Sequence, residues 1–153
     1  MKAFKSLSIA AGVALSFALV PMANAHDDAT LDAVKAPHGG QLRMAGASHY
    51  ELVVVKGSKT ATDNAIVVYV TDHAGTKIPT AGASGSVTLL AGKTKVSSVL
   101  TPDGDNKLAG HAVYASTPDM KAVVKIKLAG QGEQQARFTP LAARIAENDL
   151  HQR

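Results

Sequence analysis

Four side chains with the chemistry of metal ligands lie close together in the first third of the chain. His38 stands directly before two glycines, and Met44 follows it by six positions. His49 comes next, and Glu51 follows it by two positions. Imidazole and carboxylate groups are ordinary ligands of zinc and copper(II), whereas a thioether sulfur suits copper(I). The sequence therefore predicts a transition-metal site, holding copper or zinc, in this stretch.

A predicted hairpin would bring these side chains together. Residues 48–55 have the pattern of a β-strand, in which successive side chains point to opposite faces, so His49 and Glu51 share one face. Gly46 permits a tight turn, which lets residues 41–44 run back antiparallel and carry His38 towards that face. The alternative assigns only structural roles: a histidine that caps a glycine loop, a half-exposed strand histidine and a carboxylate that keeps an outer face soluble.

Three further histidines are weaker candidates. Cleavage of a leader after Ala25 would make His26 the first residue, whose α-amine and Nδ1 can chelate copper(II), although a polar terminus is usually disordered. His73 in a glycine loop and His111 in a predicted strand each complete a site only if the fold brings them near the others. The predicted metal ligands are thus His38, His49, Glu51, Met44, His26 and His111.

The chain is predicted to be an exported protein of one domain. Residues 1–25 have a basic start, an apolar stretch and a small-residue cleavage site, which is the pattern of a secretory signal peptide. No later stretch has the roughly 20 apolar residues of a membrane span, and the chain has no cysteine for disulfides, thiolate sites or a lipid anchor. These features predict a periplasmic protein without membrane insertion after cleavage.

Charge and composition disfavour nucleic acid as a partner. Lys2 and Lys5 belong to the predicted leader, so its removal lowers the basic count from 16 to 14 against 12 acids and the formal charge from +4 to +2. No basic cluster is interleaved with aromatic residues, which single-stranded nucleic acids require for stacking. No nucleotide-binding or nucleophile motif is present either, and most aspartates lie in turns, so we predict that the protein is not an enzyme.

The remaining pattern predicts an all-β fold. About eight short strands are separated by turn signals at a spacing of roughly 8–12 residues, as in β-sandwiches. The residues 121–128 alternate most regularly, with lysines outward and apolar side chains inward. We predict an immunoglobulin-like antiparallel sandwich of about 7–8 strands. The expected divisions are a signal peptide at 1–25, a flexible segment at 26–36 with at most a helical turn, the sandwich at 37–139 and a tail or short helix at 140–153.

Several short motifs resemble a known family. They are APHGGQL at 36–42, HYELV at 49–53, VYVTD at 68–72, GTKIP at 75–79 and GDNKL at 104–108. Together they resemble the small β-sandwich domain in the periplasmic adaptor subunits of heavy-metal RND efflux systems and in free-standing exported relatives. The resemblance implies copper, zinc or related cations as ligands, with His38, His49 and Glu51 as candidates, and an efflux adaptor or another envelope protein as partner. The chain has no room for the hairpin and other domains of a complete adaptor.

The sequence thus leads to two hypotheses of different classes. The first is a periplasmic copper- or zinc-binding protein that buffers the ion or delivers it to a heavy-metal efflux system. The alternative is a structural or interaction module of the cell envelope that uses no metal and pairs with its partner through a sheet edge.

Overall fold

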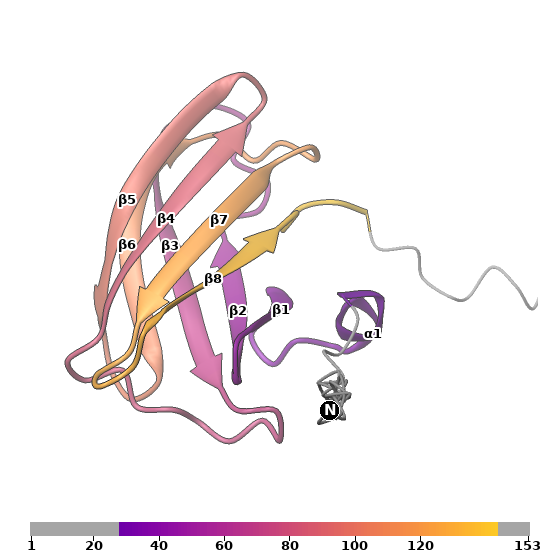
Figure 1. Cartoon of the computed structure of the whole chain (residues 1–153). Coiled ribbons are helices and arrows are strands. Elements are labelled where there is room, and N and C mark those ends of the chain that lie inside the picture. Colours follow the sequence, from indigo (N-terminus) through magenta and orange to yellow (C-terminus); the bar gives the residue numbers. More distant parts are fainter. Residues whose placement is uncertain (1–27, 144–153) are drawn as a thin grey trace, which may run out of the picture.

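The computed structural model describes residues 28–143, which form eight antiparallel strands preceded by one short helix (Figure 1). The prediction of an all-β antiparallel fold is confirmed, and each predicted strand is present. The elements are α1 (Asp28–Ala33), β1 (Gln41–Ala45), β2 (Ser48–Val54), β3 (Thr62–Thr71), β4 (Ser84–Ala91), β5 (Thr94–Pro102), β6 (Lys107–Tyr114), β7 (Lys121–Lys127) and β8 (Glu133–Phe138).

The strands form a strongly curved sheet in the order β1-β2-β3-β6-β5-β4-β7-β8, whose two end strands approach each other (Figure 1). The last residues of β5 pair with β6, while the rest of β5 pairs with β4. At the gap between the end strands, the side chain of Gln41 in β1 accepts a hydrogen bond of 2.8 Å from the backbone N–H of Thr139, just beyond β8. This contact ties the two ends of the sheet together.

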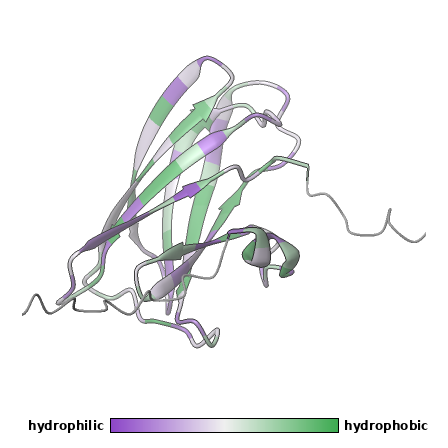
Figure 2. Ribbon diagram, turned by 45° about the vertical axis from the view of Figure 1, so that its right-hand side comes forward, coloured by the Kyte–Doolittle hydropathy of each residue, from purple (hydrophilic) through white to green (hydrophobic). Residues whose placement is uncertain are grey.

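The core lies inside the curve of the sheet. Tyr50, Leu52 and Val54 of β2 are buried in it, as the period of two predicts, and so are alternate residues of β7. Figure 2 shows hydrophobic and hydrophilic residues following one another along the strands. In β3, Ile66 and its inward neighbours are fully buried, and the opposite face is still half-buried. β3 is a central strand, because it pairs with β2 on one side and with β6 on the other.

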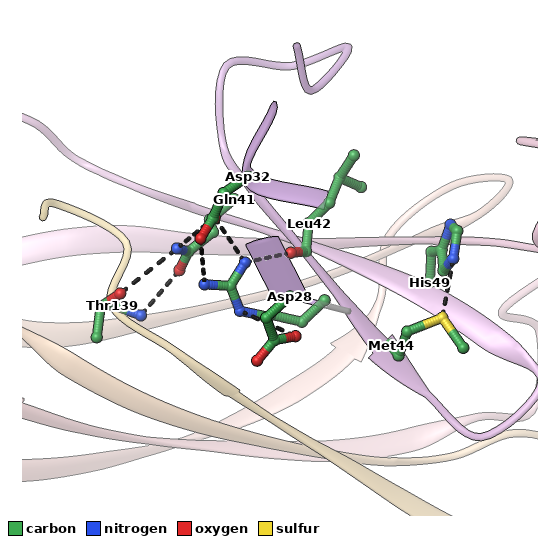
Figure 3. A network of polar contacts seen from close by, with 8 residues as sticks. Asp28, Asp32, Gln41, Leu42, Met44, His49 and Thr139 are labelled. Carbon is green, nitrogen blue, oxygen red and sulfur yellow. Dashed lines mark hydrogen bonds and ion pairs between the residues drawn. The ribbon is translucent and has the colours of Figure 1, made fainter. Parts of the chain in front are cut away.

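In the N-terminal segment, where the sequence suggested a helical turn within a lead-in, residues 28–33 form α1 beside β1. Leu31 is buried, and Asp32 accepts hydrogen bonds of 2.7 and 3.2 Å from the guanidinium of Arg43 (Figure 3). Arg43 itself is buried in β1 and also lies 3.6 Å from Asp28. A helix of six residues is too short to be stable alone, so these tertiary contacts are what hold it.

Two predictions fall outside the described residues: the signal peptide at 1–25 and most of the tail at 140–153. Within residues 28–143, no helix has the length and apolarity to cross a membrane.

Candidate metal site

The β1–β2 hairpin places a thioether against an imidazole. Gly46 adopts a φ of 61°, which is the left-handed conformation that glycine accepts most readily, and the turn pairs Met44 directly with His49. In the resulting register, Met44 Sδ lies 3.0 Å from Nε2 of His49 (Figure 3). Thus the turn predicted from the sequence is present, and it brings two of the predicted ligands into contact.

A third donor comes from the loop after β3. The last residue of β3, Thr71, is paired with His49, so the chain leaves the sheet next to that imidazole. His73 follows, and its Nδ1 lies 3.1 Å from Nε2 of His49, with the two rings nearly perpendicular at a centroid distance of 4.9 Å. Met44 and His73 therefore both contact Nε2 of His49. We call Met44, His49 and His73 the donor cluster.

The loop that holds His73 is fixed by the preceding aspartate. Oδ1 of Asp72 accepts hydrogen bonds from the backbone N–H groups of Ala74 and Thr76, at 2.9 and 2.8 Å. The hydrogen bond from Thr76 is the main cause that lowers the pKa of Asp72 below its usual value. Since the carboxylate stays ionised at neutral pH, it holds the turn closed and keeps His73 beside His49.

The contacts within the donor cluster make a demanding hydrogen-bond pattern. A neutral imidazole nitrogen offers either one hydrogen or one lone pair, and a thioether sulfur only accepts. If Nε2 of His49 accepts from His73, two lone-pair atoms, Nε2 and Sδ of Met44, face each other. If Nε2 instead donates, its single hydrogen must be shared between Met44 and His73. A cation among the three atoms would satisfy all of these lone pairs at once.

Glu51 takes a different position from that of a free ligand. It is almost fully buried, and its Oε1 accepts hydrogen bonds from the backbone N–H groups of His38 and Gly40, at 2.8 and 3.0 Å. Its Oε2 lies 2.8 Å from Nδ1 of His38. The carboxylate therefore anchors the turn before β1. This role is structural, but it differs from the alternative stated above, because Glu51 is buried and accepts the hydrogen bonds of the glycine loop itself.

His38 is oriented by these contacts. Its ring stacks on Tyr69 at a centroid distance of 3.5 Å and an angle of 4°, and Tyr69 lies directly across from Glu51 in the pairing of β2 with β3. An ionised carboxylate only accepts hydrogen bonds, so Nδ1 of His38 holds the hydrogen. In the neutral ring, Nε2 is then the nitrogen with a lone pair.

His38 and the two histidines of the donor cluster, His49 and His73, border the same cavity, which has a volume of about 350 Å³. One wall consists of α1 and the residues that follow it, including Leu31 and Val34. The other wall is the outer face of β2 and β3, with His49 and Tyr69, and His73 lies at its rim. His49 is only 9% exposed, whereas His73 is exposed and Met44 is half-buried. The donor cluster is thus reachable from solvent on one side.

The other predicted ligands are not brought to this cavity. His111 in β6 pairs with Ala65 of β3, six residues before Thr71, which corresponds to roughly 20 Å along a strand. It is well exposed and lies 3.6 Å from Asp63. His26 lies outside the described residues. Within residues 28–143, no group of three or more histidine, aspartate or glutamate side chains is close enough to hold a metal ion, so a three-ligand site here requires the thioether.

His73 is the residue that the sequence argument left out of the predicted ligand set. The signal that would have identified it is the end of β3 followed by an Asp72-centred turn, but only the register of β3 against β2 shows that this end lies beside His49. Neither a family model, nor a curated protein, nor a solved structure matches the chain. The function must therefore be argued from the chemistry of these side chains.

Proposed function

We propose that the protein binds a transition-metal ion, copper or zinc, in the periplasm and buffers it or delivers it to a heavy-metal efflux system. The observation that supports this most directly is the donor cluster. Sδ of Met44 and Nδ1 of His73 lie 3.0 and 3.1 Å from Nε2 of His49. The thioether sulfur has lone pairs, and each of the two nitrogens has one in the tautomer that places the hydrogen on the other ring nitrogen; the three atoms come from three separate segments of the chain. Binding, with no catalytic step, is the role that this set fits.

The distances within the donor cluster are close to those around a bound ion. Metal–nitrogen bonds are about 2.0–2.1 Å and metal–sulfur bonds about 2.3 Å in zinc sites. With such lengths, neighbouring donors around a trigonal three-coordinate ion are separated by roughly 3.6 Å for two nitrogens and roughly 3.8 Å for nitrogen and sulfur. The His49–His73 contact is shorter than this by about 0.5 Å and the His49–Met44 contact by about 0.8 Å. Small rotations of the exposed His73 side chain and of the flexible Met44 side chain would make this room.

The surroundings support reversible binding. His38 is held with its Nε2 available to the cavity, in the manner of metal-binding histidines whose other nitrogen donates to a carboxylate. It can therefore supply a further nitrogen when the ion moves within the cavity. Few protein ligands and an exposed rim favour release, as a carrier requires. Since imidazole binds metal only without its second proton, affinity should fall below about pH 6.5.

The cellular role rests on the sequence. The pattern of residues 1–25 supports export to the periplasm. The resemblance of the motifs in 36–108 to the adaptor domain supports a heavy-metal efflux adaptor as the receiving partner, and with it an immunoglobulin-like sandwich as the finer description of the curved sheet.

Calorimetric titration of the protein from residue 26 onward tests this function. We expect one ion per chain for at least one of copper(I), copper(II) and zinc. Binding should be lost in a His49→Ala/His73→Ala variant that keeps its far-ultraviolet circular dichroism. His111→Ala is the matched control, because this exposed histidine is distant from the cavity. Binding no tighter than about millimolar for every ion, roughly −4 kcal/mol, would contradict the proposal and favour the metal-free interaction module.

A further inference from the structure

We infer that the donor cluster selects a soft monovalent cation, copper(I) or its analogue silver(I), over zinc and copper(II). This inference rests on the proposed function and adds the oxidation state of the ion. It follows from three features of the site: the charge of the donors, their softness and their number.

The first feature is that the donor cluster itself contains no anionic side chain. The chain has no cysteine, so no thiolate can contribute. Glu51 lines the same cavity, but its two oxygens already accept two backbone N–H groups and the Nδ1–H of His38. The carboxylate of Asp72, next to His73, accepts the backbone N–H groups of its own turn. The donor cluster is therefore electrically neutral.

A neutral donor set discriminates against double charge. Placing a dication in a partly buried site costs much more solvation free energy than placing a monocation, and this cost must be offset by negative ligands. Lys35 and Glu51 both line the cavity, so the positive charge of Lys35 on the side of α1 opposes the negative charge of Glu51 on the side of β2. Copper(I) and silver(I) carry one positive charge, so they need half the negative ligand charge that zinc or copper(II) needs for neutralisation.

The second feature is the thioether of Met44. Soft sulfur ligands favour copper(I), whereas zinc sites are made from thiolates, imidazoles and carboxylates. Met44 faces His49 because the two residues are a direct cross-strand pair, so the hairpin fixes the backbone of Met44 opposite His49 and keeps its side chain beside the imidazole. In zinc binding this sulfur would contribute little.

The third feature is the number of donors. Structural zinc sites are almost always four-coordinate, and the described residues offer no cluster of three or more histidines and acids. The donor cluster supplies two nitrogens and one sulfur. Low coordination with neutral ligands is compatible with copper(I), and the position towards the cavity stays open for His38 or for a donor from the receiving protein.

The test is an anaerobic competition assay of the exported protein against a chromophoric copper(I) chelator, with parallel titrations of silver(I), zinc and copper(II). We expect copper(I) to bind at least 100-fold more tightly than zinc or copper(II). Met44→Leu, which keeps the size and apolar character of the side chain, should weaken copper(I) binding at least 10-fold and leave zinc binding unchanged. His111→Ala should change neither affinity.

A second measurement on the unmodified protein covers the case in which Met44→Leu does not fold. Methionine ε-methyl resonances report directly on thioether coordination. After titration with silver(I), the Met44 methyl signal should move, whereas that of Met120, which is fully buried in the core, should stay in place as an internal control.

The outcomes separate this inference from the proposed function. Zinc or copper(II) bound through His49 and His73 as tightly as copper(I) would overturn the inference and leave the proposed function standing. Equal copper(I) affinity in wild type and Met44→Leu, or an unchanged Met44 methyl signal, would also overturn it. Failure of every ion to bind would overturn both.

Discussion

Replacement of Glu51 separates a positioning carboxylate from a metal ligand. In the structure this buried side chain accepts three hydrogen bonds of 2.8, 2.8 and 3.0 Å, two from backbone N–H groups and one from Nδ1 of His38. In Glu51→Gln, the amide oxygen can still accept from the backbone, and His38 can change its tautomer to accept from the amide nitrogen. What is lost is the charge on the acceptor.

The expected cost follows from the strength of these bonds. Hydrogen bonds to charged groups contribute about 1.5–3 kcal/mol, against about 0.5–1.5 kcal/mol for neutral pairs. We therefore expect Glu51→Gln to lower the free energy of unfolding by about 1–3 kcal/mol. Glu51→Ala removes the acceptor of three hydrogen bonds, from the backbone N–H groups of His38 and Gly40 and from Nδ1 of His38. It should cost about 3–5 kcal/mol, since a hydrogen bond to a charged group contributes about 1.5–3 kcal/mol and water can replace part of these bonds.

Urea unfolding followed by circular dichroism measures these changes, and metal titration of the same variants gives the second readout. If Glu51 only positions His38 and the loop, folded Glu51→Gln should still bind one ion at the donor cluster with an affinity within about 10-fold of wild type, as for outer-shell partners. A stability within about 0.5 kcal/mol of wild type for both variants, or complete loss of metal binding in folded Glu51→Gln, would refute this assignment.

Three further predictions concern the elements around the site. Asp32→Asn should weaken the contact with Arg43 and release α1. Amide hydrogen exchange would then be faster in residues 28–33 and unchanged in the core strands, which serve as the control. Equal protection of residues 28–33 in the variant and the wild type would contradict this anchor. Gly46→Ala should lower the free energy of unfolding by about 1 kcal/mol or more in urea, because the φ of Gly46 is 61° and a Cβ would lie 2.7 Å from the side chain of Gln134. Gly57→Ala is the control for strain without a clash, because Gly57 also has a positive φ but a Cβ there would lie in open space. Burial raises the pKa of Tyr50 to about 12. The stability that this neutral side chain contributes is therefore full below about pH 10 and decreases by about 2–3 kcal/mol as pH rises through 12. In Tyr50→Phe the free energy of unfolding should depend less on pH in this range, and an equally steep loss in that variant would assign the loss to other groups.

The strands could be predicted from the sequence because their signals are local. Alternation identified the inward residues of β2 and β7, and Gly46 identified the hairpin that pairs Met44 with His49. The approach of His38 to Glu51 also followed from this hairpin. In each case the chain segments involved are adjacent in sequence, so period and turn chemistry were sufficient.

The features that escaped prediction depend on tertiary contacts. α1 is held by Leu31 and by the Asp32–Arg43 pair, which no local pattern reveals. His73 joins His49 only through the register of β3 on β2, and His111 is excluded by the same register, since it lies opposite Ala65 near the other end of β3. Glu51 was predicted as a metal ligand, or alternatively as a carboxylate that keeps an outer face soluble, but it is buried and accepts hydrogen bonds from the turn before β1.

X-ray absorption spectroscopy of the protein loaded anaerobically with one equivalent of copper(I) tests the central claim most directly. We predict that nitrogen atoms at about 2.0 Å and one sulfur atom at about 2.3 Å surround the copper(I) ion, by analogy with the bond lengths at zinc. The sulfur contribution should disappear in Met44→Leu and persist in His111→Ala. A shell of nitrogen and oxygen without sulfur, or a sulfur signal that persists in Met44→Leu, would contradict an ion held by Met44, His49 and His73.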